Sequence, residues 1–404
     1  MRSFLGETKM DPGYIYLRTL FIAAQLLKSG STMVIDDIAQ QPYNDEANLE
    51  AIFMGYKKSG MRAYVTTQLG NVPMYRAIPF LEPFLDAEMK RKMSASSEIP
   101  VSTYLGYLEK QIKTFNTTDN VQKYILSASG PQRTCVDLMK GIRRLSETYN
   151  LPVVCHVLET RLQRSTGDEL YGKSLVRFLE DNDLLYQNKA VIHSVWVDDY
   201  DIELLKKRNC SVVHCPASNF QLGSGLAPIH KLAHAGINVA LGSDNPSCNN
   251  NMNLFEQMKL AGMIHKIHHS DFRHWLGAED AFRMATINGA KAALAEDSVG
   301  SIEVGKKADL VILNANNATY IPKMNYTRQM VFCENGSSVR DVLIDGQLIV
   351  DHGVITTFNE AELLSEAGEM GERFLYELKN TDEESKLIAD QLTHAYYIAH
   401  GQFK

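Results

Sequence analysis

Short apolar segments alternate with amphipathic segments along most of this chain, and this alternation limits the folds open to it. The apolar segments are too short for helices and suit buried strands. Strands that alternate with helices form right-handed βαβ units around a parallel sheet, so we expect an α/β fold. The sequence predicts seven strands, at residues 31–36, 62–66, 123–127, 152–156, 190–194, 211–215 and 238–243. Helices are predicted at residues 13–29, 46–58, 82–115, 132–148, 170–182, 198–207 and 228–235.

The strand count leaves two architectures open. A closed (β/α)8 barrel needs eight strands, whereas an open doubly wound sheet needs no fixed number. At 404 residues, the chain is long enough for one large barrel or for two ordinary domains.

Composition and charge exclude several classes of partner. Hydrophobic residues make up 45% of the chain and charged residues 22%, as in ordinary globular proteins. A net charge of −7 gives no general attraction to nucleic acid or to anionic membranes, so neither is expected as a partner. There is no run of 18 apolar residues and no signal-peptide pattern, which favours a cytoplasmic location. The six cysteines form no C-x-x-C pair, and we interpret them as reduced thiols.

The segment 151–160, LPVVCHVLET, places His156 and Glu159 just after a short apolar strand. The carboxyl end of a parallel strand is where α/β enzymes hold their reactive groups. A neutral imidazole with a carboxylate three residues later can supply a metal ligand and a proton carrier. The alternative is a hydrogen-bonded core histidine, which is the commoner role for a histidine after a strand.

Two later strands end in the same way. His193 follows the apolar run 190–192, where a core histidine is an equally good interpretation, and Asp198 or Asp199 could cap the next helix. Asp244 follows the strand at 238–243 and could bind a metal or accept the proton of an attacking water. Asp244 could instead cap a helix that begins near Met252.

The remaining central histidines are interpreted without a catalytic role. His214, His230 and His234 are expected to be structural. A further group is expected to lie on a solvated helix and loop, and it consists of His265, His268, His269 and His274.

The C-terminal third predicts a second unit outside the main sheet. Short strands with tight turns at Asp345-Gly346 and His352-Gly353 predict a small antiparallel sheet. Its strands are expected at residues 309–313, 342–344 and 348–350, and a peripheral helical segment at 359–400. We therefore expect a barrel domain at 1–298, part of a small β domain at 299–355 and a helical tail at 356–404.

Taken together, these motifs resemble the amidohydrolase superfamily. The resemblance rests on H-x-x-E at 156–159, His193, S-N-x-x-L-G-S-G-x-A-P at 218–228, G-S-D at 242–244 and G-S-I-E-x-G-K-x-A-D-L at 300–310. It runs from about residue 15 to residue 355 in the order of the family. The most similar branch contains triazine chlorohydrolases and aminohydrolases, methylthioadenosine and S-adenosylhomocysteine deaminases, and cytosine deaminases.

The resemblance implies a metal-dependent hydrolase with a (β/α)8 TIM-type barrel and a small accessory β domain. It implies one divalent metal ion, usually zinc or iron, that activates water for attack on an electron-poor ring carbon. By this analogy, His156 and Asp244 are metal ligands, and Glu159 carries the proton from water to substrate. His193 then orients or polarises the hydroxide.

One departure from the family concerns the metal. The family carries an H-x-H pair on its first barrel strand, but residues 1–155 of this chain contain no histidine. The strand at 31–36 follows a helix and resembles the second strand of the family. We therefore expect the first strand, and the preceding half of the small β domain, to lie upstream of Met1. Two ligands alone do not hold a catalytic zinc tightly, because such sites ordinarily use three protein ligands.

A second departure concerns the substrate. The purine-nucleoside deaminases of this branch tend to place a histidine after the fourth strand, where this chain has SASGPQRTC at 127–135. Gln132 and Arg133 could contact substrate instead, although Arg133 could equally be a surface residue at a helix start. With Asn245 after Asp244, this pattern weighs against a nucleoside substrate. We assign Glu159, Arg133 and Asn245 as candidate substrate-binding residues.

Two function classes remain open on the sequence. The first is a metal-dependent hydrolase that cleaves a non-peptide C–N bond of a cyclic amidine or small N-heterocycle and releases ammonia or an amine. The second is a non-catalytic homologue that keeps the fold for binding or for assembly, for example as a homo-oligomer. A dinucleotide-binding enzyme is a weaker alternative, because no strand is followed by G-x-G-x-x-G.

Overall fold

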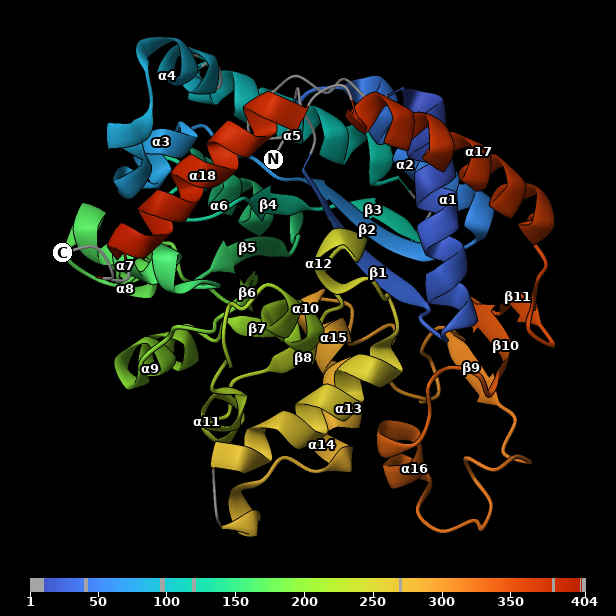
Figure 1. The fold of residues 1–404 in the computed structure, drawn as a ribbon. Helices are drawn as coiled ribbons and strands as arrows, with labels where there is room; N and C mark the ends of the chain where they lie inside the picture. The colour runs from blue at the N-terminus through green and yellow to red at the C-terminus, as the bar shows by residue number, and fades with distance from the viewer. Residues whose placement is uncertain are drawn as a thin grey trace.

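The protein has parallel strands at its centre and helices around them (Figure 1). The computed structural model describes residues 11–39, 43–94, 99–117, 121–268, 271–379, 382–399 and 401. The central strands are β1 (Met33–Ile38), β2 (Arg62–Thr67), β3 (Gln122–Tyr124), β4 (Leu126–Ala128), β5 (Val153–Val157), β6 (Lys189–His193), β7 (Ser211–His214) and β8 (Val239–Leu241). The seven predicted strands are confirmed, and the one expected at 123–127 is divided into β3 and β4.

Helices connect and cover these strands. Those up to β5 are α1 (Pro12–Lys28), α2 (Glu46–Ser59), α3 (Met74–Ala77), η2 (Pro79–Phe84), α4 (Ala87–Ser94), α5 (Val101–Phe115) and α6 (Val136–Tyr149). Those between β5 and β8 are α7 (Arg161–Tyr171), α8 (Leu175–Asp181), α9 (Asp199–Lys207), α10 (Pro216–Gln221) and α11 (Ile229–His234). Those after β8 are α12 (Pro246–Asn249), α13 (Leu254–Ile264), η4 (His265–His268), η5 (Phe272–His274), α14 (Ala278–Ala285), α15 (Ile287–Ala292), α16 (Tyr326–Phe332), α17 (Glu360–Lys379) and α18 (Asp382–Ala399).

The central strands pair in parallel and in chain order. One hydrogen-bonded sheet runs β1-β2-β3 and the next runs β4-β5-β6-β7-β8. Between them, the Ile125 N–H donates to the Val65 carbonyl at 2.8 Å, and the Leu126 N–H donates to the Pro152 carbonyl at 3.3 Å. The chain therefore changes partner at Ile125, and the two sheets follow one another around a TIM-type barrel. Among the described residues, β1 pairs only with β2, and β8 only with β7.

The barrel interior determines which side chains reach the site. Val154 of β5, Ala190 of β6 and Ala240 of β8 form one buried cluster with Ala292 of α15. Since side chains along a strand alternate between its two faces, His156 points to the same interior side as Val154. The side chains on the opposite face of each strand belong to the larger core, which lies between the strands and the surrounding helices.

Helix boundaries differ from the prediction where the chain turns sharply. The single helix predicted at 170–182 is divided between two helices. α7 ends at Tyr171, next to Gly172 with its left-handed φ of 64°, and Ser174 caps α8. The long helical insert expected at 82–115 is three elements, η2, α4 and α5. Pro100 stands at the N-terminal end of α5, where its fixed φ suits a helix start. Asp198 caps α9 with a reciprocal hydrogen bond to Asp201, as expected for one of the two candidates.

The C-terminal helix α18 contacts both η2 and α7 (Figure 1). Ala395 is fully buried against the insert, and the Gln391 side chain donates to the Phe84 carbonyl at 2.9 Å. The Ser165 hydroxyl on α7 donates to the Ala399 carbonyl at 3.1 Å. In the described part of the chain, no helix is long and apolar enough to cross a membrane.

A small antiparallel sheet lies beside the barrel, as the C-terminal pattern predicted. Its order is β12 (Val354–Ile355), β11 (Gln347–Asp351), β10 (Val339–Ile344) and β9 (Leu310–Leu313). Arg62 at the start of β2 pairs with Asp309 next to β9, with Nε to Oδ2 at 2.7 Å and Nη2 to Oδ1 at 2.8 Å. Both side chains are almost fully buried, so this bidentate pair joins the small sheet to the barrel.

Candidate active site

His156, His193 and Asp244 come from one end of the barrel. His156 lies in β5, His193 is the last residue of β6, and Asp244 follows β8 by three residues. Because all these strands are parallel, their carboxyl ends meet at the same edge. We expected these side chains to converge at one metal site; the structure places them at the same end of the barrel, but their ligand atoms do not form a group of three within 4.8 Å.

His193 stands between two carboxylates. Its Nε2 lies 3.8 Å from an oxygen of Glu159 and 4.0 Å from Oδ2 of Asp244. Its Nδ1 lies 2.9 Å from the Asn219 side-chain oxygen, and since that oxygen can only accept, Nδ1 carries the proton and Nε2 is an acceptor. Burial lowers the pKa of His193, with Asp244 and Asn219 opposing the shift, so the imidazole is neutral near pH 7.

His156 is oriented through its other nitrogen. Its Nδ1 lies 3.1 Å from the Ser129 carbonyl oxygen and 3.7 Å from Oδ2 of Asp37. A carbonyl accepts, so Nδ1 donates and Nε2 keeps a lone pair that can bind a metal ion. The rings of His156 and His193 have centroids 5.5 Å apart.

Glu159 is a carboxyl group adapted for proton transfer. Burial raises its pKa, the nearby His156 lowers it, and Asp244 raises it further, with a net increase. Its backbone N–H donates to the Gln163 side-chain oxygen at 2.7 Å, which holds the loop between β5 and α7. A carboxyl group with a raised pKa both accepts and returns a proton more readily near neutral pH.

Asp244 is fixed by two donors. The Ser218 hydroxyl donates to its Oδ2 at 2.5 Å, and the Asn245 N–H donates to its Oδ1 at 2.7 Å. The alternative that Asp244 caps the next long helix is wrong, because Asn253 caps α13. Asn245 caps the short helix α12 through its side-chain oxygen, which accepts from the Ser247 N–H at 3.0 Å.

A cavity of about 250 Å³ lies beside His156 and Glu159 and reaches Ile78, which directly precedes η2. Arg133 lines it, and its Nε is buried, so the alternative of a surface position at a helix start is wrong. The lining residues are Gln68, Ile78, Ser129, Gln132, Arg133, His156, Glu159, Thr160, Leu162, Gln163 and Thr166.

Sequence patterns missed several residues of this site. Asp37 of β1 lies beside His156, and burial raises its pKa to about 6, although His156 and hydrogen bonds oppose the shift. Asp37 could have been noticed because it lies two residues after Ile35 and so on the same face of the strand. The adjacent Asp36 obscured this pattern, because it breaks the alternation of apolar and polar residues. Asn219, which orients His193, lies in the motif at 218–228 but was given no role, and Gln163, which holds the loop of Glu159, gave no signal separate from its helix.

His214 and His230 lie near His265 on the outside of the barrel, whereas His234 is exposed. His214 of β7 is fully buried, with its ring centroid 5.5 Å from that of His265. His230 of α11 lies 6.3 Å from His265 by the same measure. The expectation that His265 is solvated is wrong, since it is 4% exposed. His269 lies outside the described residues, and His274 is exposed as expected.

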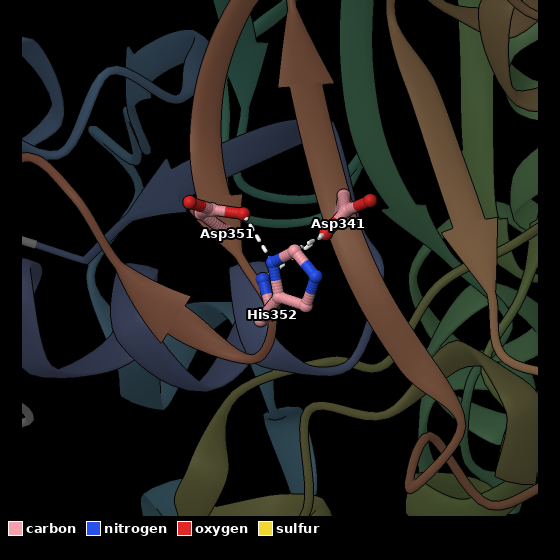
Figure 2. Close-up of side chains that lie close together, drawn as sticks. All are labelled: Asp341, Asp351 and His352. Atoms are coloured by element: carbon pink, nitrogen blue, oxygen red, sulfur yellow. Dashed lines mark hydrogen bonds and ion pairs between the residues drawn. The ribbon is translucent and has the colours of Figure 1, made fainter.

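A different group of potential ligands lies in the small sheet. Figure 2 shows His352 next to Asp341 and Asp351, and their ligand atoms lie within 4.8 Å of one another, the only such group of three in the described ranges. Arg340 pairs with Asp341 at 2.7 Å, and the His352 N–H donates to Asp341 at 3.0 Å. These contacts tie the turn after β11 to β10, so we interpret the group as structural.

The site fits a divalent metal ion by its donor chemistry. Imidazole nitrogen and carboxylate oxygen are the ligands that zinc and iron accept in proteins. His156 presents Nε2 because its Nδ1 faces a carbonyl, and Asp244 presents a carboxylate anchored by Ser218. Histidines and carboxylates gathered at the carboxyl end of a parallel barrel define the class of metal-dependent barrel hydrolases.

Comparison with known proteins places the chain within this class. The profile of the Amidohydrolase family matches residues 1–369. The 5'-deoxyadenosine deaminase of Methanosarcina acetivorans is 36% identical over 362 residues, which cover 90% of this chain and 76% of that protein. The 5-methylthioadenosine/S-adenosylhomocysteine deaminase of Thermococcus kodakarensis is 31% identical over 344 residues, or 85% of this chain and 73% of the relative. The chain belongs to the amidohydrolase family.

A solved structure supports the same fold. The adenosine deaminase of Xanthomonas campestris, crystallised with bound zinc, superposes with a TM-score of 0.77 at 25% identity. The match covers 90% of this chain and 76% of that one.

Proposed function

We propose that this chain is a metal-dependent aminohydrolase that cleaves a non-peptide C–N bond of a cyclic amidine or N-heterocycle and releases ammonia or an amine. The observation that carries the proposal is the position of His193 Nε2, 3.8 Å from Glu159 and 4.0 Å from Asp244, where Glu159 and His156 line a cavity. The named activities of the relatives, which are deaminases of adenosine derivatives, support an N-heterocyclic substrate.

His156 and Asp244 would hold a single divalent ion, zinc or iron. When bound, such an ion lowers the pKa of water and supplies a nucleophile at neutral pH. The zinc in the related adenosine deaminase structure supports this assignment. Ser218 and the Asn245 N–H hold the Asp244 carboxylate in place, and the Ser129 carbonyl does the same for the His156 ring.

The other residues divide the proton chemistry. His193 accepts a hydrogen bond at Nε2 and so orients the attacking water. Glu159 takes a proton from that water and delivers it to the substrate, first to the ring nitrogen beside the attacked carbon. Glu159 next takes the proton of the new hydroxyl group and passes it to the leaving nitrogen. The C–N bond breaks as the C=O bond forms, and ammonia or an amine departs as a neutral molecule. Gln132 and Gln163, whose amides lie 3.1 Å apart, are placed in the cavity wall to hydrogen-bond the ring.

The test is ammonia release from a panel of aminotriazines, aminopyrimidines and aminopurines, with zinc and iron content measured on the same preparation. Turnover of one compound class, together with about one metal ion per chain, is the expected result. Bound metal without turnover of any compound would refute the proposal.

A non-catalytic role is the second candidate. It is favoured by one specific observation: the sequence offers His156 and Asp244 as proposed ligands, whereas catalytic zinc ordinarily has three protein ligands. Absence of tightly bound metal and of turnover, with the fold intact by circular dichroism, would favour this role.

A further inference from the structure

Arg133 is a cation in the cavity wall that has no acidic partner among the residues that the structure describes. In the described part of the chain its guanidinium makes one hydrogen bond, from Nη1 to the Met74 sulfur at 2.8 Å, and its buried Nε has no partner. A thioether is a weak, neutral acceptor. Burial lowers the pKa of Arg133, and no carboxylate of the described residues offsets this shift.

Arg62, a buried arginine of the barrel, shows how a structural cation is held in this fold. Arg62 is bound on two nitrogens by Asp309, with both side chains nearly inaccessible. A charge removed from water without a partner is costly, and proteins keep such groups mainly where a ligand completes them. Arg133 therefore differs from Arg62 in that its hydrogen-bond partner is a thioether and not a carboxylate, as expected for a group that binds a ligand.

The backbone also makes room for this guanidinium. A Cβ at Gly70 would come within 3.3 Å of Nη2 and 3.4 Å of Nε of Arg133, so glycine lets the side chain lie flat against the loop after β2. The same cavity contains Gln132, Gln163 and the Glu159 carboxyl, which are hydrogen-bonding groups for a ring. Glu159 does not pair with Arg133, so the cationic end and the proton-transfer end of the cavity are separate.

We propose that Arg133 binds an anionic substituent of the substrate, and that the substrate class is small N-heterocycles bearing a carboxylate or a similar planar anion close to the ring. This inference rests on the proposed function. The guanidinium fork matches a planar carboxylate, which would replace the Met74 sulfur as partner. A cavity of about 250 Å³ is smaller than the ~300–1,000 Å³ of sites for drug-sized ligands, which fits a ring with a short substituent.

The experiment measures binding of matched carboxylate and carboxamide derivatives of aminopyrimidine, aminotriazine and aminopurine rings by calorimetry. The two members of each pair have the same shape and differ in charge. For at least one ring, the wild-type chain should bind the carboxylate about tenfold or more tightly, as expected for a charge-assisted bidentate contact. Arg133→Gln should abolish this preference, and Arg133→Lys should retain part of it.

Arg161→Gln is the matched control, because Arg161 is an exposed cation on the neighbouring helix α7 and does not line the cavity. It should keep the wild-type preference. The inference is overturned if no pair shows a charge preference, or if Arg133→Gln leaves the preference unchanged. Ammonia release distinguishes the two proposals. If binding depends on Arg133 but no compound releases ammonia, the proposed function alone is refuted. If ammonia is released at a rate that depends on neither the carboxylate nor Arg133, this inference alone is refuted.

Discussion

At the scale of single residues, burial determines what the ionisable groups of this protein can do. Glu159 and His193 are shifted in opposite directions by the same cause, since burial disfavours the charged form of each. The pKa of the Glu159 carboxyl group is thereby brought closer to neutral pH, and the His193 imidazole stays uncharged. A carboxyl group with a raised pKa and a neutral imidazole thus lie 3.8 Å apart, as the proposed roles of proton carrier and water acceptor require.

The first prediction concerns Glu159→Gln. The amide keeps the shape of the side chain but cannot carry a proton, so turnover should fall by ~10²–10⁴-fold, the usual contribution of a general acid–base group. Metal content should be unchanged, because Glu159 is not a proposed ligand. Turnover would be followed by ammonia release and metal content by elemental analysis. Undiminished turnover would exclude Glu159 as the proton carrier.

The second prediction concerns Glu334, which stabilises the turn before β10. Burial raises its pKa, but hydrogen bonds from Ser338 and the N–H groups of Asn335 and Gly336 outweigh burial, and the net pKa is lowered. Because the folded pKa lies below the unfolded one, the stabilisation is full above the ordinary glutamate pKa and is lost as pH falls through the folded value.

Glu334→Gln should therefore cost about 1–2 kcal/mol at pH 7, and the difference from wild type should shrink in acid. Urea unfolding at several pH values measures both effects. Glu366→Gln, at an exposed position of α17, serves as the control and should change little at any pH. A penalty for Glu334→Gln that is the same at all pH values would contradict this account.

At the scale of elements, the small sheet depends on its ion pair with the barrel. Asp309→Ala should destabilise the protein by about 3–5 kcal/mol, because it leaves the buried Arg62 guanidinium unpaired. Lys307→Ala is the matched control: it breaks the exposed pair with Asp345 at 3.0 Å, which should be worth about 0–1 kcal/mol. Chemical unfolding of the two variants compares them directly. Equal effects would show that burial of the pair is unimportant.

The same scale shows what sequence could and could not foresee. Strands were predictable because each is a short apolar run, and His156, His193 and Asp244 were predictable because each follows such a run. The division of the helix predicted at 170–182 was harder to predict from sequence, since it depends on Gly172 taking a left-handed φ. For Arg133 the sequence could not decide between a substrate contact and a surface position, because its place in the cavity depends on Met74 of α3, which is distant in sequence.

At the scale of the whole molecule, a metal ion would join strands that are distant around the barrel. His156 belongs to β5 and Asp244 follows β8, and two strands separate β5 from β8 in the sheet. An ion bound to both residues binds the folded chain alone, since the unfolded chain does not bring them together. Ligand binding of this kind stabilises the whole fold.

The last prediction follows from this linkage. Zinc at about 100 times its Kd should stabilise the folded chain by about 2.7 kcal/mol and raise Tm accordingly. Asp244→Ala should abolish the shift because it removes a ligand and a charge, whereas Glu159→Gln should keep it. Asp341→Asn tests the group of potential ligands in the small sheet and should also keep the shift, because Arg340 already pairs with Asp341 at 2.7 Å. If Asp341→Asn lost the shift and Asp244→Ala kept it, zinc would bind the small sheet, and the barrel site would lose its assigned ligands.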